Sequence, residues 1–397
     1  MSSHAHVHAP VGGELWTRPF RILVAIAALG GAMALWRFVA GLAAVSNLND
    51  GYPWGVWIAF DVVTGTALGC GGYAVALLVY ILNKGEYHPL VRPALLTSLL
   101  GYGLAVLAVT IDLGRPWALW KVPVYFWRWS HSPQLEVALC VATYVMVVLL
   151  ELSPAAFEKW QHGEDTRLRR LARTGSALVA KAMPFLLALG LLLPTMHQSS
   201  LGTMMLLPGP RLHALWFTPW LPLLFLVNAI LMGIGVVMLE SHVAASAFGR
   251  RRETALLGSL GRIGAWLAAF FVAFRAIDLT LRGALPQLAS WYGLAAALEL
   301  VLLLAGAFVL LSPAQRRNPG RQVAAGLLLV AGGAVYRFNV YLVGFRPGSH
   351  WSYFPAVPEL LITFGIVALE IALYVAAVRT FPILAGPAPA RLQGETR

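Results

Sequence analysis

The chain has 397 residues, of which 59% are hydrophobic and 12% charged, and its mean hydropathy is +0.72. This composition excludes an ordinary soluble domain and predicts a polytopic membrane protein. The formal net charge of +12 at pH 7 requires no nucleic-acid partner, because the basic residues lie in short loops where an anionic membrane lipid surface accounts for them.

Apolar segments long enough to cross a bilayer, which takes about 20 residues, recur along the whole chain. We expect ten spans, at residues 22–44, 54–82, 93–111, 135–152, 177–193, 216–239, 263–281, 291–311, 323–343 and 360–378. The predicted fold is therefore an all-α bundle of about ten transmembrane helices. In this predicted fold, residues 1–19 form a polar N-terminal tail without a cleavable signal peptide. Residues 20–380 form the transmembrane domain, and residues 381–397 form a C-terminal tail.

The loops between the expected spans differ in charge. Loops after even-numbered spans hold thirteen cations: Lys84, Arg92, Lys159, Arg167, Arg169, Arg170, Arg173, Arg250, Arg251, Arg252, Arg316, Arg317 and Arg321. Loops after odd-numbered spans hold six: Arg115, Lys121, Arg128, Arg211, Arg282 and Arg346. The positive-inside rule therefore predicts that both termini and the even-numbered loops are cytoplasmic, with the chain in a bacterial inner membrane.

The cysteines and histidines argue against a redox metal group in this chain. An iron–sulfur cluster usually needs four thiolates, whereas the chain has only Cys70 and Cys140. Haem held by two histidines needs imidazoles well inside the membrane. The histidines after residue 8 are all expected at span ends or in loops, although an outer pair of His131 and His197 stays open. His4, His6 and His8 could bind a metal weakly, and a tail without a site is the alternative.

Polar and aromatic side chains gather at the expected outer ends of several spans. Ionisable groups in a membrane cost about 3 kcal/mol each, so such a cluster suggests a pocket for a polar head group. The members of the predicted pocket are Trp54, Trp57, Asp112, Arg115, Glu136, His197 and Gln198. Simpler interpretations also stand: Asp112 and Arg115 could neutralise each other at i,i+3, and the tryptophans fit an interfacial belt.

A second polar set is spread through the expected bundle. It consists of Asp61, Tyr144, Glu151, Glu240, Glu299 and Glu370. These residues could form a proton path between the outer pocket and the cytoplasm. Buried ion pairs that fix helix register explain them equally well, and the sequence leaves both alternatives open.

Six motifs connect the chain with a known family. They are GYPWGVWIAFD (51–61), ALGCGGYA (67–74), EYHPLVRPALL (86–96), TIDLGRPW (110–117), LLPTMHQSSLG (192–202) and YFPAVPELLITFG (353–365). Through them, from about residue 12 to residue 383, the chain resembles the NrfD/PsrC (polysulfide-reductase-like) membrane subunits, and within them the HybB branch.

The resemblance implies a haem-free anchor that binds menaquinone or ubiquinone at the outer face and is not catalytic alone. It implies as partners a ferredoxin-like iron–sulfur subunit and the small and large subunits of a periplasmic [NiFe]-hydrogenase. In such a site His197 would donate a hydrogen bond to the quinone, Glu136 would relay protons and Arg115 would stabilise negative charge. The alternative is a secondary transporter for a small anion. Pro184 and Pro194 interrupt one expected span, but the motifs do not repeat between the halves.

Overall fold

The computed structural model describes residues 8–161, 163–250 and 252–385, and in them it confirms the all-α membrane bundle. Ten helical segments in these ranges are long and apolar enough to cross a membrane. The spans are α1 (Arg18–Ala40), a composite second span (Trp57–Ile81), a third (Gly85–Asp112) that ends in α4 (Val91–Asp112), α6 (Pro133–Gln161), α7 (Thr166–Met204), α8 (Leu221–Ala247), α9 (Thr254–Leu281), α10 (Trp291–Leu311), α12 with η9 (Pro319–Val343) and α13 (Val357–Thr380).

Short helical turns make up most of the remaining described structure. They are η1 (Leu42–Ala44), η4 (Gly85–Leu90), η5 (Pro116–Ala118), α5 (Lys121–Val124), η6 (Phe126–Arg128), η7 (Gly209–Arg211), η8 (Leu285–Ala289) and α11 (Pro313–Arg316). The described residues form no strand beyond two isolated bridges, His8 with Ala385 and Leu212 with Phe345.

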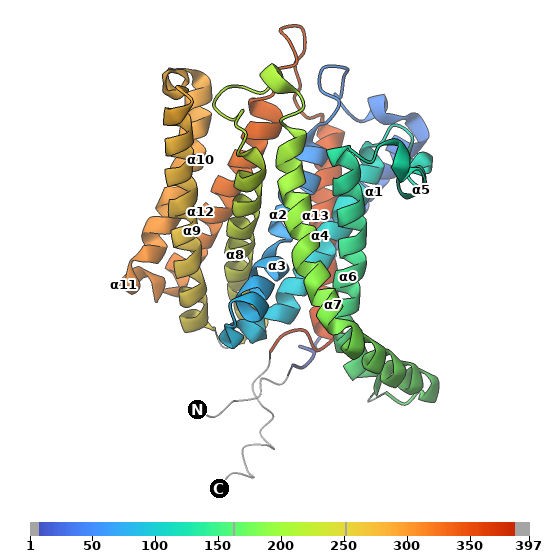
Figure 1. Cartoon of the computed structure of the whole chain (residues 1–397). Helices are drawn as coiled ribbons and strands as arrows, with labels where there is room; N and C mark the ends of the chain where they lie inside the picture. Colours follow the sequence, from blue (N-terminus) through green and yellow to red (C-terminus); the bar gives the residue numbers. More distant parts are fainter. Residues whose placement is uncertain (1–7, 162, 251, 386–397) are drawn as a thin grey trace.

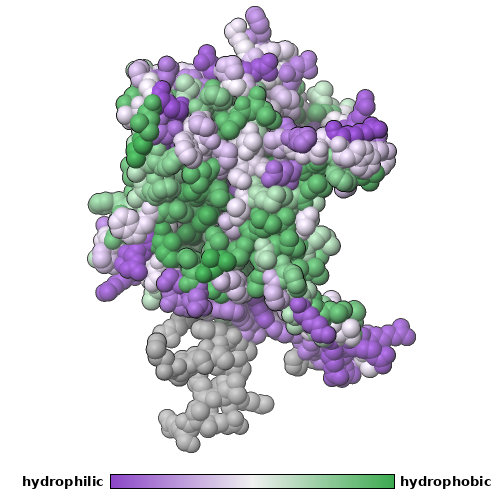
Figure 2. Space-filling model, viewed as in Figure 1, coloured by the Kyte–Doolittle hydropathy of each residue, from purple (hydrophilic) through white to green (hydrophobic). Residues whose placement is uncertain are grey.

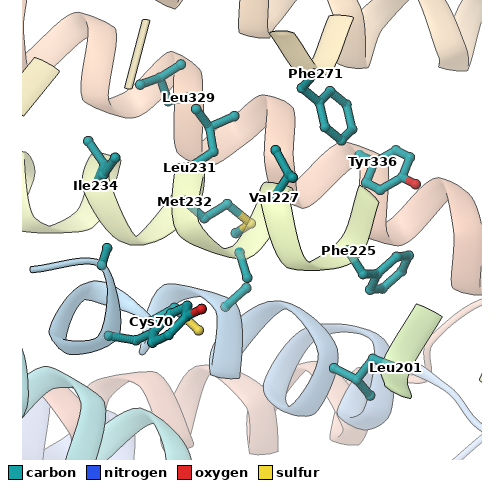
Figure 3. Packing of buried hydrophobic residues seen from close by; sticks show 14 of the residues in the cluster. Cys70, Leu201, Phe225, Val227, Leu231, Met232, Ile234, Phe271, Leu329 and Tyr336 are labelled. Atoms are coloured by element: carbon teal, nitrogen blue, oxygen red, sulfur yellow. The ribbon is translucent and has the colours of Figure 1, made fainter. Parts of the chain in front are cut away.

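The spans form two neighbouring groups flanked by a helix pair (Figure 1). The second span, α4, α6 and α7 form one group, and α8, α9, α10 and α12 form the other. Helix α1 packs on α13 beside α4. The second span and α8 are the most buried, whereas α1 is mostly exposed to lipid. At the core, Phe225 of α8 lies against Tyr336 of α12 with ring centroids 5.7 Å apart (Figure 3).

The two described ends of the chain lie together. The backbone N–H of Ala9 donates to Leu384 (3.4 Å) and that of Val11 to Val378 (3.0 Å). The loops after the even-numbered spans lie at this same end of the bundle (Figure 1). The charge asymmetry of the sequence therefore corresponds to two ends of one bundle, and the assignment of this end to the cytoplasm stays a prediction from the positive-inside rule.

Helix α7 is much longer than the expected span at residues 177–193. It runs from Thr166 to Met204 and passes through Pro184 and Pro194 without ending. Proline is tolerated in membrane helices because neighbouring groups compensate the lost hydrogen bond. The expectation that this span ends before His197 is therefore wrong.

The second span, expected to be one continuous helix, is broken near its middle. Two π-helical segments, η2 (Trp57–Thr64) and η3 (Leu77–Ile81), flank the α-helical segments α2 (Gly65–Leu68) and α3 (Gly71–Ala76). At the break, the Ser98 hydroxyl donates to the carbonyl of Gly69 (2.5 Å) and accepts from the N–H of Gly72 (3.1 Å). A Cβ on Gly72 would lie 2.5 Å from the Ser98 oxygen. The glycines here thus allow close helix packing.

Candidate functional site

A buried carboxylate organises the end of the bundle opposite the chain ends. Glu359 is at the third position of α13 and is fully buried. It accepts hydrogen bonds from the Tyr353 hydroxyl (2.6 Å) and from the backbone N–H groups of Asn47 (3.0 Å) and Ala356 (2.8 Å). These donors tie the loop after α1 and the loop before α13 to the start of α13, so this end has one defined geometry.

Tyr353 connects this carboxylate to the second span. Its hydroxyl also accepts a hydrogen bond from the N–H of Val56 at 2.8 Å. Burial, together with the hydrogen bond to Glu359, raises the pKa of the Tyr353 phenol. The phenol therefore stays protonated and acts as a permanent donor to Glu359.

Two predicted site residues lie around Glu359. The indole of Trp57 is fully buried and donates to the backbone carbonyl of Glu359 at 3.2 Å. Asp112, at the end of α4, interacts electrostatically with Glu359 and with Arg37 of α1. Arg37 donates to the backbone carbonyls of Ile111 (2.5 Å) and Leu113 on either side of Asp112. One buried carboxyl oxygen of Asp112 has no hydrogen-bond partner in the described protein, so it is able to bind a polar group of a ligand.

An apolar groove of about 480 Å³ begins beside this polar group. It lies between α1, α4 and α13, and Ile111, which directly precedes Asp112, is in its wall. Small residues of α1 form much of the lining, and Gly30 approaches α13 so closely that a Cβ there would lie 2.6 Å from the Cα of Gly365. The polar group and the groove together suit a molecule with a polar head and an apolar chain.

The other predicted members of the outer pocket are not part of this arrangement. Trp54 donates to the carbonyl of Tyr341 (3.0 Å) and packs on Phe345, beside a separate aromatic cavity of about 760 Å³. Arg115 is exposed in the loop after α4, and Glu136 is half-buried in the first turn of α6. The described residues contain no salt bridge between Asp112 and Arg115, so the i,i+3 neutralisation that the sequence left open is not seen; Arg37 supplies the neighbouring positive charge instead.

His197 and Gln198 lie deep in the bundle instead of at its outer end. The His197 ring is 3.1 Å from the Thr66 hydroxyl, and the amide of Gln198 donates to Thr66 (3.2 Å) and to Tyr102 (3.3 Å). Tyr102 is ten residues before Asp112, about 15 Å along α4. The expectation that these two residues share the level of Asp112 and Glu136 is therefore wrong, because α7 continues through Pro194.

Arg337 extends this central group, which consists of Thr66, Tyr102, His197, Gln198, Asn228 and Arg337. Its fully buried guanidinium donates to the Asn228 side chain (2.7 Å) and to the carbonyls of Val63 (2.7 Å) and Phe225 (2.8 Å). Among the described residues it forms no salt bridge. The buried atoms Nδ1 of His197, Oε1 of Gln198 and Nδ2 of Asn228 have no hydrogen-bond partner in the described protein, so these atoms keep the capacity to bond a further polar group.

Three of the six predicted proton-path residues follow one line. The buried carboxylate of Asp61 accepts from the Thr363 hydroxyl (3.0 Å) and interacts electrostatically with Glu370. Glu370 in turn interacts with Glu240, which accepts from the hydroxyls of Thr97 (2.8 Å) and Tyr374 (2.6 Å). Glu240 lines a small pocket of about 60 Å³ together with Arg250 and Glu253 of the loop near the chain ends.

The other three residues lie elsewhere. Tyr144 of α6 packs on Tyr102, with ring centroids 4.6 Å apart, and interacts electrostatically with Glu151. Glu299 of α10 accepts from Arg275 (3.1 Å), Trp216 (3.1 Å) and Asn339 (2.7 Å). For Glu299 the structure therefore favours the alternative of a buried ion pair that fixes helix register.

Two histidines are buried in the described spans, and each has a hydrogen-bond partner on another helix. His197 is 3.1 Å from the Thr66 hydroxyl within the central group, and His242 of α8 is 2.6 Å from the side chain of Gln322 of α12. His131 is exposed in a loop, so it does not pair with the deeply buried His197. His4 and His6 lie outside the described residues.

Comparison with known proteins gives a family and several relatives. The family model "Polysulphide reductase, NrfD" matches residues 44–346. The chain is 40% identical over 390 residues to the "Probable Ni/Fe-hydrogenase 2 b-type cytochrome subunit" of Escherichia coli, covering 96% of each chain. It is 27% identical over 378 residues to the "Menaquinone reductase, integral membrane subunit" of Nitratidesulfovibrio vulgaris, covering 89% of this chain and 88% of that one.

Proposed function

Because the chain belongs to the NrfD family of polysulfide-reductase membrane subunits, we propose that it is the quinone-binding membrane subunit of a hydrogenase complex. The names of the two relatives support a hydrogenase partner and a quinone substrate. The observation that carries the proposal concerns Asp112: one of its carboxyl oxygens has no partner in the described protein, and the residue before it, Ile111, lines the apolar groove between α1, α4 and α13.

In this proposal the groove holds the isoprenoid chain and the polar group around Glu359 holds the quinone head. Quinone reduction takes up two electrons and two protons. Asp112 can hold and pass on a proton at the quinone oxygen, and the Arg37 guanidinium can stabilise negative charge that develops there. Trp57 forms a rigid wall through its bond to the backbone of Glu359. His197 and Gln198 belong to the central group in this proposal and not to the head-group site.

Electrons would come from a ferredoxin-like iron–sulfur partner docked on the end of the bundle that holds Glu359. That partner would receive them from the small and large [NiFe]-hydrogenase subunits. Under the positive-inside assignment this end faces the periplasm. This chain then supplies the quinone site and the membrane anchor, and the complex as a whole is the hydrogen:quinone oxidoreductase.

We also propose that the chain holds no haem, although the name of the Escherichia coli relative includes a b-type cytochrome. The arrangement of His197 and His242 supports this proposal, since each is bonded to a different neighbouring helix. A reduced-minus-oxidised spectrum of the purified chain tests it: a b-type band in a one-to-one ratio with the chain would refute it.

Protons for the quinone could come from the other end of the bundle through Glu240, Glu370 and Asp61. Thr363, the hydrogen-bond partner of Asp61, is four residues after Glu359 on α13 and thus one turn away. The line of acids therefore leads from the pocket near the chain ends towards the proposed head-group site. Proton uptake by this route would make hydrogen oxidation electrogenic.

A photoreactive quinone tests the proposed site directly. It should label α1, α4 or α13 along the groove, and an excess of unmodified quinone should prevent the labelling. Labelling at the aromatic cavity beside Trp54 would place the quinone site there instead. If no labelling is prevented by excess quinone, the proposed site is refuted.

The broken second span favours a second candidate, a secondary transporter for a small anion, because discontinuous helices are typical of such proteins. Anion flux into vesicles that contain the purified chain separates the two functions. Flux without quinone binding would support the transporter.

A further inference from the structure

The last turns of α6 and the first turns of α7 form an arm that projects beyond the bundle (Figure 1). At 1.5 Å per residue, the 39 residues of α7 extend about 58 Å, nearly twice the hydrocarbon thickness of about 30 Å. The arm is tightly packed: the amide of Gln161 donates to Ser176 (2.9 Å), and a Cβ on Gly175 would lie 2.6 Å from the ring of Phe157. The arm is therefore a direct continuation of the two membrane helices.

One face of α7 is exposed along both the membrane segment and the arm. Residues seven apart lie nearly on one helix face, because seven residues make about two turns. The exposed residues in this register are Leu171, Leu178, Phe185 and Leu192, with between 52% and 75% of their surface accessible. The next register, Ala172, Val179 and Leu186, is buried. The face that contacts lipid in the membrane therefore continues onto the arm.

This face changes from apolar to basic where it enters the arm. A hollow of about 500 Å³ lies there, lined by Thr166, Arg167, Arg170, Leu171 and Thr174. Both arginines are exposed and form no salt bridge with a described residue. Apolar residues lie where the arm joins the bundle, and hydrophilic residues predominate towards its end (Figure 2). Two arginines and two threonines thus line an open hollow at the edge of the lipid-facing stripe.

We infer that this hollow binds the head group of an anionic phospholipid. Guanidinium groups recognise phosphate oxygens in pairs of hydrogen bonds, and the threonine hydroxyls add further donors. The acyl chains would lie along Leu178 and Phe185, which continue the same face into the membrane. A soluble protein partner would contact the two arginines but not the apolar face that runs from them into the membrane. An anionic lipid explains both the charges and the apolar face. The inference does not depend on the proposed function.

The test measures lipid retained by the purified chain. Native mass spectrometry of protein released from nanodiscs counts bound cardiolipin or phosphatidylglycerol, with phosphatidylcholine discs for comparison. The double variant Arg167→Gln/Arg170→Gln removes the two charges of the hollow. Arg317→Gln/Arg321→Gln is the matched control, because it removes two exposed charges at the same end of the bundle. A third variant, Arg167→Lys/Arg170→Lys, keeps the charge.

Wild type, control and lysine variant should retain anionic lipid, whereas the glutamine variant at the hollow should bind it about 30-fold more weakly, or about fivefold per charge. Equal losses in the hollow and control variants would show a general charge effect and overturn the site. Displacement by millimolar inorganic phosphate or glycerol phosphate would show a phosphate site without lipid specificity and would also overturn it. Equal melting temperatures for all variants would show that the fold is unchanged.

Discussion

Glu299 in α10 and Asp61 in the second span are both buried acids within membrane helices, but their surroundings differ. Glu299 has a guanidinium, an indole N–H and an amide as partners. Asp61 has one hydroxyl from Thr363 and no cation among the described residues. An acid that accepts from donors on several helices, one of them a guanidinium, holds those helices together. Asp61, Glu370 and Glu240 accept no hydrogen bond from a cation of the described residues, and this leaves them available for the proposed proton route.

Replacing Glu299 by Gln should have the largest effect on stability, because it removes the carboxylate 3.1 Å from the buried Arg275 guanidinium and leaves only Asp278, at 4.0 Å, as its charge partner. We expect a loss of about 3 kcal/mol or more in the free energy of unfolding. Thermal unfolding in detergent measures it. The matched variant Asp61→Asn should cost less than about 1 kcal/mol, since an amide can still accept from Thr363. Similar losses of unfolding free energy in both variants would show that Glu299 and Asp61 do not differ in their contribution to stability.

Asp112→Asn should have the largest effect on activity. It preserves shape but removes the proton-holding group at the proposed quinone head, so hydrogen oxidation with a quinone analogue should fall about 100-fold. Activity with a soluble dye should not change, because a dye can take electrons from the partner subunits. Arg115→Gln is the control and should leave both rates unaltered. If Asp112→Asn turns over quinone at the normal rate, the site lies elsewhere.

Glu240→Gln and Glu370→Gln test the line of acids. Each should lower quinone-linked turnover several-fold and weaken the effect of membrane potential on it, because each interrupts the proposed proton route. Membrane vesicles with an imposed potential provide the measurement. Glu151→Gln changes an acid of α6 that lies beside Gly190 of α7 and outside this line. Its turnover is compared with that of the Glu240 variant. An undiminished response to potential in the Glu240 variant would leave that residue a structural role through Thr97 and Tyr374.

His197→Gln should have the smallest effect, because the structure places His197 beside Tyr102, which lies about 15 Å from Asp112 along α4. We expect the barrier to quinone reduction to change by no more than about 1 kcal/mol, the usual size of one hydrogen bond. Steady-state kinetics with a quinone analogue give kcat and KM. A loss as large as that of Asp112→Asn would move the head group towards Thr66 and Tyr102.

The sequence predicts the ten spans well because length and hydropathy decide which segments cross a membrane. It predicts depth poorly where a helix continues past a proline, and this explains the displaced positions of His197 and Gln198. Arg37 and Glu359 lie in the candidate site, but no spacing in the sequence connects them to Asp112. Their contact arises from the packing of α1 and α13 beside α4, which joins residues more than 300 positions apart. Asp112 and Trp57 were identifiable because both lie at the ends of apolar runs.

The pairing of α1 with α13 also has a consequence for how the protein is made. Of the ten described spans, α1 enters the membrane first during synthesis, and its packing partner α13 leaves the ribosome last. Until α13 is inserted, α1 contacts lipid instead of its packing partner. Its mostly exposed apolar surface is compatible with this contact. The groove between α1, α4 and α13 can form only after insertion is complete. A chain that stops before Val357 should therefore insert its other spans and still lack the groove.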